Sequence, residues 1–186
     1  MTARRPRHVL PDLLRPGLDL VFCGTAAGRA SAEAGAYYAH PGNFFWRTLH
    51  AVGLTPRRLA PHEFATLLDY GIGLTDLAKR HYGNDDELPD GAFDVAALRR
   101  KIARHAPRYL AFTSKNAAQA CCGHAVAYGA QDWRIATAAV FVLPSPSGQA
   151  RRFWDPSPWR ALAAALESAR AAPARGPDRG DPHGTG

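Results

Sequence analysis

Short apolar runs alternate along the chain with stretches in which apolar residues recur at helical spacing. Buried strands are predicted at 18–23 (LDLVFC), 109–113 (YLAFT) and 139–143 (AVFVL), with a weaker fourth at 71–74. Helices are predicted between and after them, at 43–52, 61–68, 94–105, 115–128 and 158–170. This order of elements predicts an α/β fold: a three-layer α/β/α sandwich around a mostly parallel, four-stranded sheet.

Both ends of the chain lack this periodicity. Residues 1–16 alternate arginine with proline and leucine, and residues 171–186 combine proline, glycine and charge. We therefore expect a basic N-terminal extension (1–16), one folded domain (17–170) and a disordered tail (171–186). No apolar run approaches the ~20 residues of a membrane-spanning helix. We expect a cytoplasmic monomer without membrane contacts.

The charge balance favours an anionic partner. The chain has 23 lysines and arginines against 16 acidic residues, and only Lys79, Lys101 and Lys115 are lysine. Guanidinium groups grip phosphate oxygens bidentately, so DNA or RNA is a plausible partner. Arginine content also follows genome composition, so charge alone does not decide between the two explanations.

The residues that bind metals in other proteins are scattered here. Cys121 and Cys122 are adjacent, which suits neither a standard disulfide nor a CxxC metal site, and the third cysteine, Cys23, is distant in sequence. The eight histidines show no clustered ligand pattern, and His40 suits bracing of its own loop. We expect reduced thiols, no catalytic metal and no cofactor.

The segments after the predicted strands are the places to look for function, because open parallel sheets bind ligands beyond the carboxyl ends of their strands. The first is the small-residue turn 24–28 (GTAAG), whose backbone amides can approach a ligand closely. The others are 114–116 (SKN) and 144–152 (PSPSGQARR), which is rigid at its start and basic at its end.

Four blocks follow one another between residues 18 and 166: VFCGTAAG at 21–28, AHPGNFFW at 39–46, LLDYGIGLTDL at 67–77 and LPSPSG at 143–148. In this order they resemble the uracil-DNA glycosylase superfamily, and within it the mismatch-specific uracil/thymine branch. The resemblance implies base excision repair: an enzyme that flips a damaged base out of DNA and hydrolyses its N-glycosidic bond. Its partners would be DNA containing uracil or another deaminated base, with free uracil as product.

The resemblance also implies a pocket for the flipped base. Tyr38 matches the aromatic residue that stacks on that base, although a core tyrosine under a loop is the alternative. Asn43 either fixes its loop or contacts the pocket. The backbone of the first turn would hold the base edge, through Gly24, Thr25, Ala27 and Gly28.

Two positions depart from the family pattern. Ala26 stands where relatives usually carry Asn or Asp to position or activate the attacking water, and a methyl group can do neither. Ser145 stands where relatives often carry His or Asn, and it can still donate one hydrogen bond to the departing base. Glu33, on the loop before Tyr38, is the nearby carboxylate that can replace the missing general base. The alternative is that Glu33 is a solvated loop glutamate. Loss of one general base or water-positioning group lowers the reaction rate about 10²–10⁴-fold, while positioning and electrostatic contributions to catalysis remain.

The last predicted loop matches the segment that enters the duplex in relatives: Ser147, Gly148, Gln149, Ala150 and Arg151. Gly148 would permit close backbone approach, Gln149 would act as the wedge, and Arg151 would reach a phosphate or the orphaned base. Lys115 would reach a phosphate from the third strand's loop. An exposed proline-rich turn and a solvated lysine are the structural alternatives.

Three functions remain to be separated. The first is a monofunctional glycosylase, because no lysine is an obvious nucleophile for a lyase step. Its substrate range should be broad, because Ala26 and Ser145 leave few polar groups to reject a wrong base. The second is a non-catalytic binder of flipped bases or abasic sites. The third is a small-molecule nucleoside hydrolase, which would need no basic DNA-entering loop.

Overall fold

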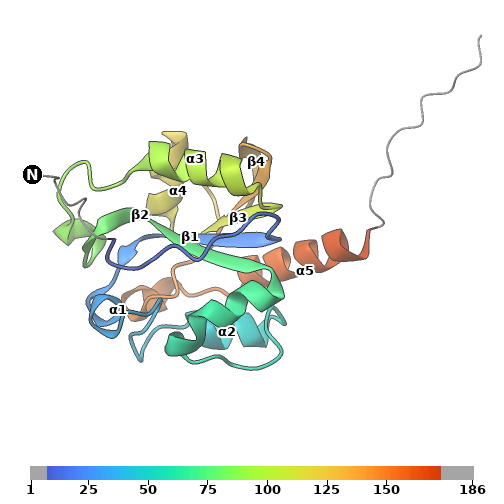
Figure 1. Cartoon of the computed structure of the whole chain (residues 1–186), viewed down its shortest axis with the longest axis horizontal. Coiled ribbons are helices and arrows are strands. Elements are labelled where there is room, and N and C mark those ends of the chain that lie inside the picture. The colour runs from blue at the N-terminus through green and yellow to red at the C-terminus, as the bar shows by residue number, and fades with distance from the viewer. Residues whose placement is uncertain (1–7, 173–186) are drawn as a thin grey trace, which may run out of the picture.

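The structure, a computed structural model, describes residues 8–172 (Figure 1). Residues 1–7 and 173–186, and with them nearly all of the predicted tail, lie outside the described part. Five strands form one sheet in the order β2-β1-β3-β5-β4. They are β1 (Leu20–Ala27), β2 (Ile72–Tyr82), β3 (Tyr109–Phe112), β4 (Gly129–Ile135) and β5 (Ala138–Val142). The first four in that order are parallel, and β4 runs antiparallel to β5.

Helices cover both faces of the sheet (Figure 1). On one side lie α1 (Arg29–Ala34), α2 (Phe45–Ala51), α5 (Ser157–Ala171) and the 3-10 helix η1 (Pro61–Tyr70). On the other lie α3 (Val95–His105) and α4 (Lys115–Cys122). Two short 3-10 helices, η2 (Asp85–Glu87) and η3 (Gly148–Phe153), lie in connections. The predicted three-layer α/β architecture is confirmed.

Strand β1 shows why the sheet needs a helical layer on each side. Leu20 and Phe22 belong to the core cluster that includes α2 and α5, whereas Val21 and Cys23 belong to the cluster that includes α3 and α4. Successive side chains of a strand point to opposite faces, so a continuously apolar strand must be covered twice. Phe22 illustrates the packing: its ring stacks on that of Trp159 at 5.6 Å.

The predicted four strands are too few, and the predicted helix 115–128 is too long. The helix ends at Cys122, where Gly123 adopts a left-handed conformation (φ 80°). Gly123 is a typical helix-ending glycine. The following residues form β4, an edge strand in which exposed and half-buried residues alternate before the buried Ile135. β4 was not predicted because its polar sequence contains no apolar run.

The first two strands are longer than predicted. β1 continues through Ala27, so most of the expected turn 24–28 belongs to the strand and only Gly28 lies beyond it. β2 begins near the predicted strand 71–74 but extends to Tyr82, with every residue from Ile72 to Lys79 buried. The extension matters for function because it brings polar residues of β2 into the interior.

The part of the N-terminal extension that the structure describes, residues 8–16, packs on the domain. Leu10 and Leu13 are 1% and 8% exposed, and Leu13 forms an antiparallel bridge with Leu74 of β2. This segment therefore belongs to the fold rather than to a loose arm. Within residues 8–172, no helix is long and apolar enough to cross a membrane.

Asp12 of this segment anchors β2 and α3. Its carboxylate lies 3.0 Å from Lys79 Nζ and 2.7 Å from Lys101 Nζ, and it accepts a hydrogen bond from Thr75 Oγ1 at 2.7 Å. Lys79 also donates to the hydroxyl of Tyr37 at 3.0 Å. Burial alone would raise the pKa of Asp12, but the two lysines and Thr75 outweigh burial and lower it. One carboxylate thus forms ion pairs with two shielded amines.

We expect Asp12→Ala to lower the free energy of unfolding by about 3 kcal/mol, because it leaves the buried Lys79 without its counter-charge. Urea denaturation followed by circular dichroism measures the loss. Asp90→Ala, at an exposed position, is the matched control and should change stability by less than about 0.5 kcal/mol. Equal losses in both variants would contradict an anchoring role for Asp12.

Candidate functional site

The site is built around a close contact between neighbouring strands. Gly24 of β1 and Asp76 of β2 are partners in the parallel register. A Cβ atom on Gly24 would lie 2.6 Å from Asp76 Oδ1, 3.6 Å from Thr113 Oγ1 and 3.6 Å from the Tyr38 hydroxyl. No side chain fits there without displacing the carboxyl group. Glycine at position 24 therefore creates the space into which these three polar groups converge.

Asp76 is only 5% exposed, and among the described residues no group donates a hydrogen bond to its carboxylate. Burial raises its pKa to about 6, while Lys79 and Lys101 act to lower the pKa and Asp12 to raise it. A buried carboxylate without a partner is costly, and such groups cluster at functional sites. Asp76 is therefore a candidate to contact a ligand.

Tyr38 presents an aromatic surface beside this carboxyl group. One face of its ring stacks on Phe45, with the centroids 3.8 Å apart and the planes at 17°. The hydroxyl lies 3.3 Å from Thr113 Oγ1. The backbone of Tyr38 has φ 52°, an uncommon conformation outside glycine, and the next amide, of Ala39, donates to Ser31 Oγ at 3.0 Å. Backbone strain of this kind is often retained at functional sites.

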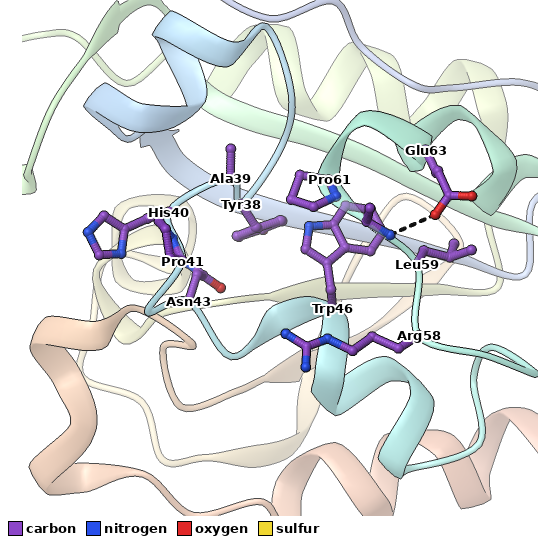
Figure 2. Close-up of a pocket in the computed structure, with 11 residues that line it drawn as sticks. Tyr38, Ala39, His40, Pro41, Asn43, Trp46, Arg58, Leu59, Pro61 and Glu63 are labelled. Carbon is purple, nitrogen blue, oxygen red and sulfur yellow. Dashed lines mark hydrogen bonds between the residues drawn. The ribbon is translucent and has the colours of Figure 1, made fainter.

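A cavity of about 400 Å³ opens beside Tyr38. Figure 2 shows the loop from Tyr38 to Asn43 on one side of it and the segment from Arg58 to Glu63 on the other. Asn43 lines the cavity and accepts a hydrogen bond from Phe45 N at 2.9 Å, and its contact with a bound base stays a prediction. His40 Nδ1 accepts from Gly42 N at 2.9 Å, which confirms that His40 braces its loop.

The loop after β5 packs against the loop after Tyr38. Phe44 N donates to Pro146 O at 2.8 Å, and a Cβ atom on Gly148 would lie 3.3 Å from Gly42 O. Ser145 Oγ accepts from Ser147 N at 3.3 Å, which leaves the Ser145 hydroxyl proton free to donate. Two of the predicted segments thus meet at the site.

Other predicted site residues lie elsewhere or have partners. Glu33 is exposed on α1, so the prediction of a loop at this position is wrong. Thr25 Oγ1 donates to Asp85, which also accepts from Asn116 Nδ2 at 2.7 Å. Lys115 Nζ lies 4.4 Å from the centre of the Tyr128 ring. Ala26 is half-buried and paired with Ala78 of β2, so it offers only its methyl group and backbone.

All three lysines of the chain are placed by the structure. Lys79 and Lys101 both pair with Asp12, and Lys115 contacts the Tyr128 ring. The three cysteines are free thiols, as predicted. Within residues 8–172, no group of three or more His, Cys, Asp or Glu side chains is arranged to hold a metal ion.

Asp76 is the site residue that was not predicted. It lies in the block LLDYGIGLTDL, but Thr75 and Asp76 interrupt the apolar run that predicted the strand. The available signal was the position of the block itself. Because Thr75 and Asp76 lie inside a block shared with the family, they are better interpreted as candidate site residues than as the end of the strand.

Asp76→Asn should make the protein more stable at pH 7.5, by about 1–3 kcal/mol. The folded state raises the pKa of Asp76 from 3.8 to about 6, so it holds the proton more tightly than the unfolded chain. The destabilisation due to ionised Asp76 therefore develops as the pH rises from about 4 through 6. Urea denaturation should show the gain at pH 7.5 and a much smaller one at pH 4. The exposed control Asp69→Asn should show neither, and equal stability of wild type and Asp76→Asn at pH 7.5 would contradict the assignment.

Comparisons with known proteins agree with the resemblance seen in the sequence. Residues 11–167 match the Uracil DNA glycosylase superfamily. A solution NMR structure of a candidate uracil DNA glycosylase from Methanosarcina acetivorans superimposes with a TM-score of 0.58 and 26% sequence identity. The match covers 87% of this chain and 98% of that one. Because the family match spans most of its length and the fold agrees, the chain belongs to the uracil DNA glycosylase superfamily.

Proposed function

We propose that the protein is a monofunctional DNA glycosylase that hydrolyses the N-glycosidic bond of uracil, or of a related deaminated base, in base excision repair. The observation that carries the proposal is that the Tyr38 ring lies close to the carboxyl group of Asp76. Phe45 covers one face of the Tyr38 ring, and the hydroxyl end of that ring lies near the carboxyl group. A flipped base stacked on the other face would direct its polar edge toward Asp76.

The chemistry of Asp76 favours deaminated bases. Uracil carries a ring N–H at N3 and hypoxanthine carries one at N1, which an ionised carboxylate accepts. Cytosine and adenine carry a lone pair at those ring positions, so they would leave a buried carboxylate facing another acceptor. An uncompensated buried polar group is costly, which is the condition for strong discrimination.

Bond cleavage then needs a leaving group and a nucleophile. The base leaves as an anion, which the free hydroxyl proton of Ser145 can stabilise. Water adds its oxygen to the sugar C1′, one proton ends on the released base, and the products are free base and an abasic site. Ala26 supplies no side chain for the water, and Gly24 and Ala26 are paired with β2, so backbone N–H groups at the end of β1 and the phosphates of the substrate carry the electrostatic stabilisation in this proposal.

The placement of the lysines supports hydrolysis rather than a lyase reaction. A lyase step needs a free amine that forms a covalent bond with the sugar. Lys79 and Lys101 are both paired with Asp12, and Lys115 lies over an aromatic ring. Water is therefore the nucleophile in this proposal. The four sequence blocks favour the mismatch-specific uracil/thymine branch of the superfamily.

Ala26 favours one rival function, a protein that binds flipped bases or abasic sites without cleaving DNA. A binder would form a complex with uracil-containing DNA and release no base. Single-turnover conditions, with protein in excess over DNA, separate the two functions because they detect even a slow chemical step.

We expect single-turnover release of uracil from a uracil-containing duplex by the wild-type protein. Tyr38→Ala should slow it about 10- to 100-fold, because base–aromatic stacking contributes about 1–3 kcal/mol. The control Tyr38→Phe keeps the ring and loses only the contact with Thr113, so it should lose less than about tenfold. Binding without any release of uracil would establish the rival function, whereas equal rates for Ala and Phe at position 38 would refute stacking.

The substrate range provides a second measurement. We expect release of more than one base when uracil, hypoxanthine, xanthine and mispaired thymine are compared in the same duplex, because Ala26 and Ser145 leave few polar side chains to exclude alternatives. Strict preference for uracil would contradict this expectation. Cleavage of free deoxyuridine at a rate similar to that of DNA would point to a small-molecule hydrolase.

A further inference from the structure

Within the described part of the chain, three arginines without an ion pair lie close together around Phe44, Trp154 and the start of α5, although other arginines, such as Arg100 and Arg104 of α3, also lack one. Elsewhere, Arg29, Arg57, Arg108 and Arg170 each form an ion pair with a carboxylate. Among the residues that the structure describes, no carboxylate forms an ion pair with Arg47, Arg151 or Arg160. Asp155 lies near Arg160 without forming an ion pair with it, so the three guanidinium groups keep a net positive charge that an approaching anion meets.

Phe44 holds two of these arginines in place. The Arg47 guanidinium carbon lies 3.6 Å from the centre of the Phe44 ring, and that of Arg151 lies 5.3 Å from it. Phe44 is 8% exposed and packs edge to face against Trp154. A cation held over a buried ring has already lost much of its rotamer freedom, so binding an anion costs less entropy.

A second cavity, of about 290 Å³, lies beside these aromatic rings. It is lined by Arg47, Thr48, Ala51, Val52, Trp154, Pro156 and Arg160. Its lining contains two cations and no carboxylate, and the Thr48 hydroxyl already donates to Phe44 O at 2.6 Å. Pro156 precedes the first turn of α5, whose N-terminal backbone dipole adds to the positive potential. The cavity therefore combines apolar lining residues with two guanidinium groups.

The cavity is connected to the candidate site through a short stretch of chain. Asn43 lines the first cavity, Phe44 follows it directly, and Arg47 lines the second. Phe44 N is also bound to Pro146 O of the loop after β5. A nucleic acid strand with its reactive nucleotide at Tyr38 can therefore continue over Phe44 toward Arg160, with phosphates repeating along the strand.

We propose that the cavity between Arg47 and Arg160 binds a backbone phosphate of the DNA strand that carries the flipped nucleotide. This inference rests on the proposed function, and it names a phosphodiester as the ligand. Arg47 and Arg160 contribute bidentate donors, and Arg151 neutralises a phosphate nearer to the reactive nucleotide. The contact adds affinity that is independent of the base and offsets part of the cost of unstacking.

The test compares two double variants that each remove two positive charges. Arg47→Gln with Arg160→Gln changes the cavity, and Arg100→Gln with Arg104→Gln changes exposed arginines of α3, on the other face of the sheet. Affinity for a uracil-containing duplex is measured between 50 and 200 mM salt. The cavity variant should weaken binding about tenfold and make the log–log salt slope shallower by about 1, as expected for one lost phosphate contact. The α3 variant should leave the slope unchanged.

A methylphosphonate scan locates the contact. Replacing one phosphate at a time with a neutral methylphosphonate should weaken wild-type binding at one position near the uracil, and should cause no further loss at that position in the cavity variant. Urea denaturation confirms that both variants fold. Equal slopes for the two variants, or an additive loss at every position, would overturn the phosphate site while leaving the glycosylase proposal intact. Failure of the wild-type protein to bind or cleave DNA would overturn both.

Discussion

The absence of a side chain at Gly24 is the constraint on which the candidate site depends. The parallel register places Gly24 beside Asp76, and even one carbon atom more would collide with the carboxyl group. The same gap brings the Tyr38 hydroxyl and Thr113 to that carboxyl. Backbone pairing between two strands, rather than a mobile loop, therefore determines where the polar groups of the site meet. Such a rigid base is suited to holding a ligand edge in a defined orientation.

A buried, unpaired carboxylate lowers the stability of the strand that carries it, and the surrounding structure offsets the loss. Asp12, in the N-terminal segment, forms ion pairs with Lys79 of β2 and Lys101 of α3. β2 is also fixed by its pairing with β1 and by burial of every residue from Ile72 to Lys79. Asp12 thus stabilises the fold, whereas the carboxylate of Asp76 has no hydrogen-bond partner among the described residues. Groups that reduce stability in this way are often found at functional sites.

The surface arginines are restrained in two ways. Four arginines distant from Phe44 form ion pairs with carboxylates, whereas Arg47 and Arg151 are held by the Phe44 ring. Ring contacts restrain a guanidinium group without cancelling its charge. The bond between Phe44 and Pro146 joins this surface to the loop that carries Ser145. The proposed base site and the proposed phosphate site are therefore connected through the backbone and the ring of Phe44.

Local patterns in the sequence determined most of the architecture. Continuous apolar runs identified the central strands, because a strand covered on both faces needs apolar residues at every position. The predicted helix at 94–105 is present as α3, and Asp94 caps it by accepting a hydrogen bond from Ala97 N. The family blocks predicted Tyr38 as a site residue and included parts of the two loops that meet at Phe44.

Only the tertiary structure decided the length of β2, the existence of β4 and the position of Asp76. Polar residues occupy buried positions of β2 because Asp12, more than sixty residues away in the chain, supplies the charges and hydrogen bonds that they need. Periodicity within a short window contains no information about such a distant partner. Glu33 shows the converse: it is near Tyr38 in sequence, yet helix α1 leaves it exposed to solvent. Proximity along the chain predicts local structure, whereas burial and charge pairing depend on contacts that form only when the chain has folded.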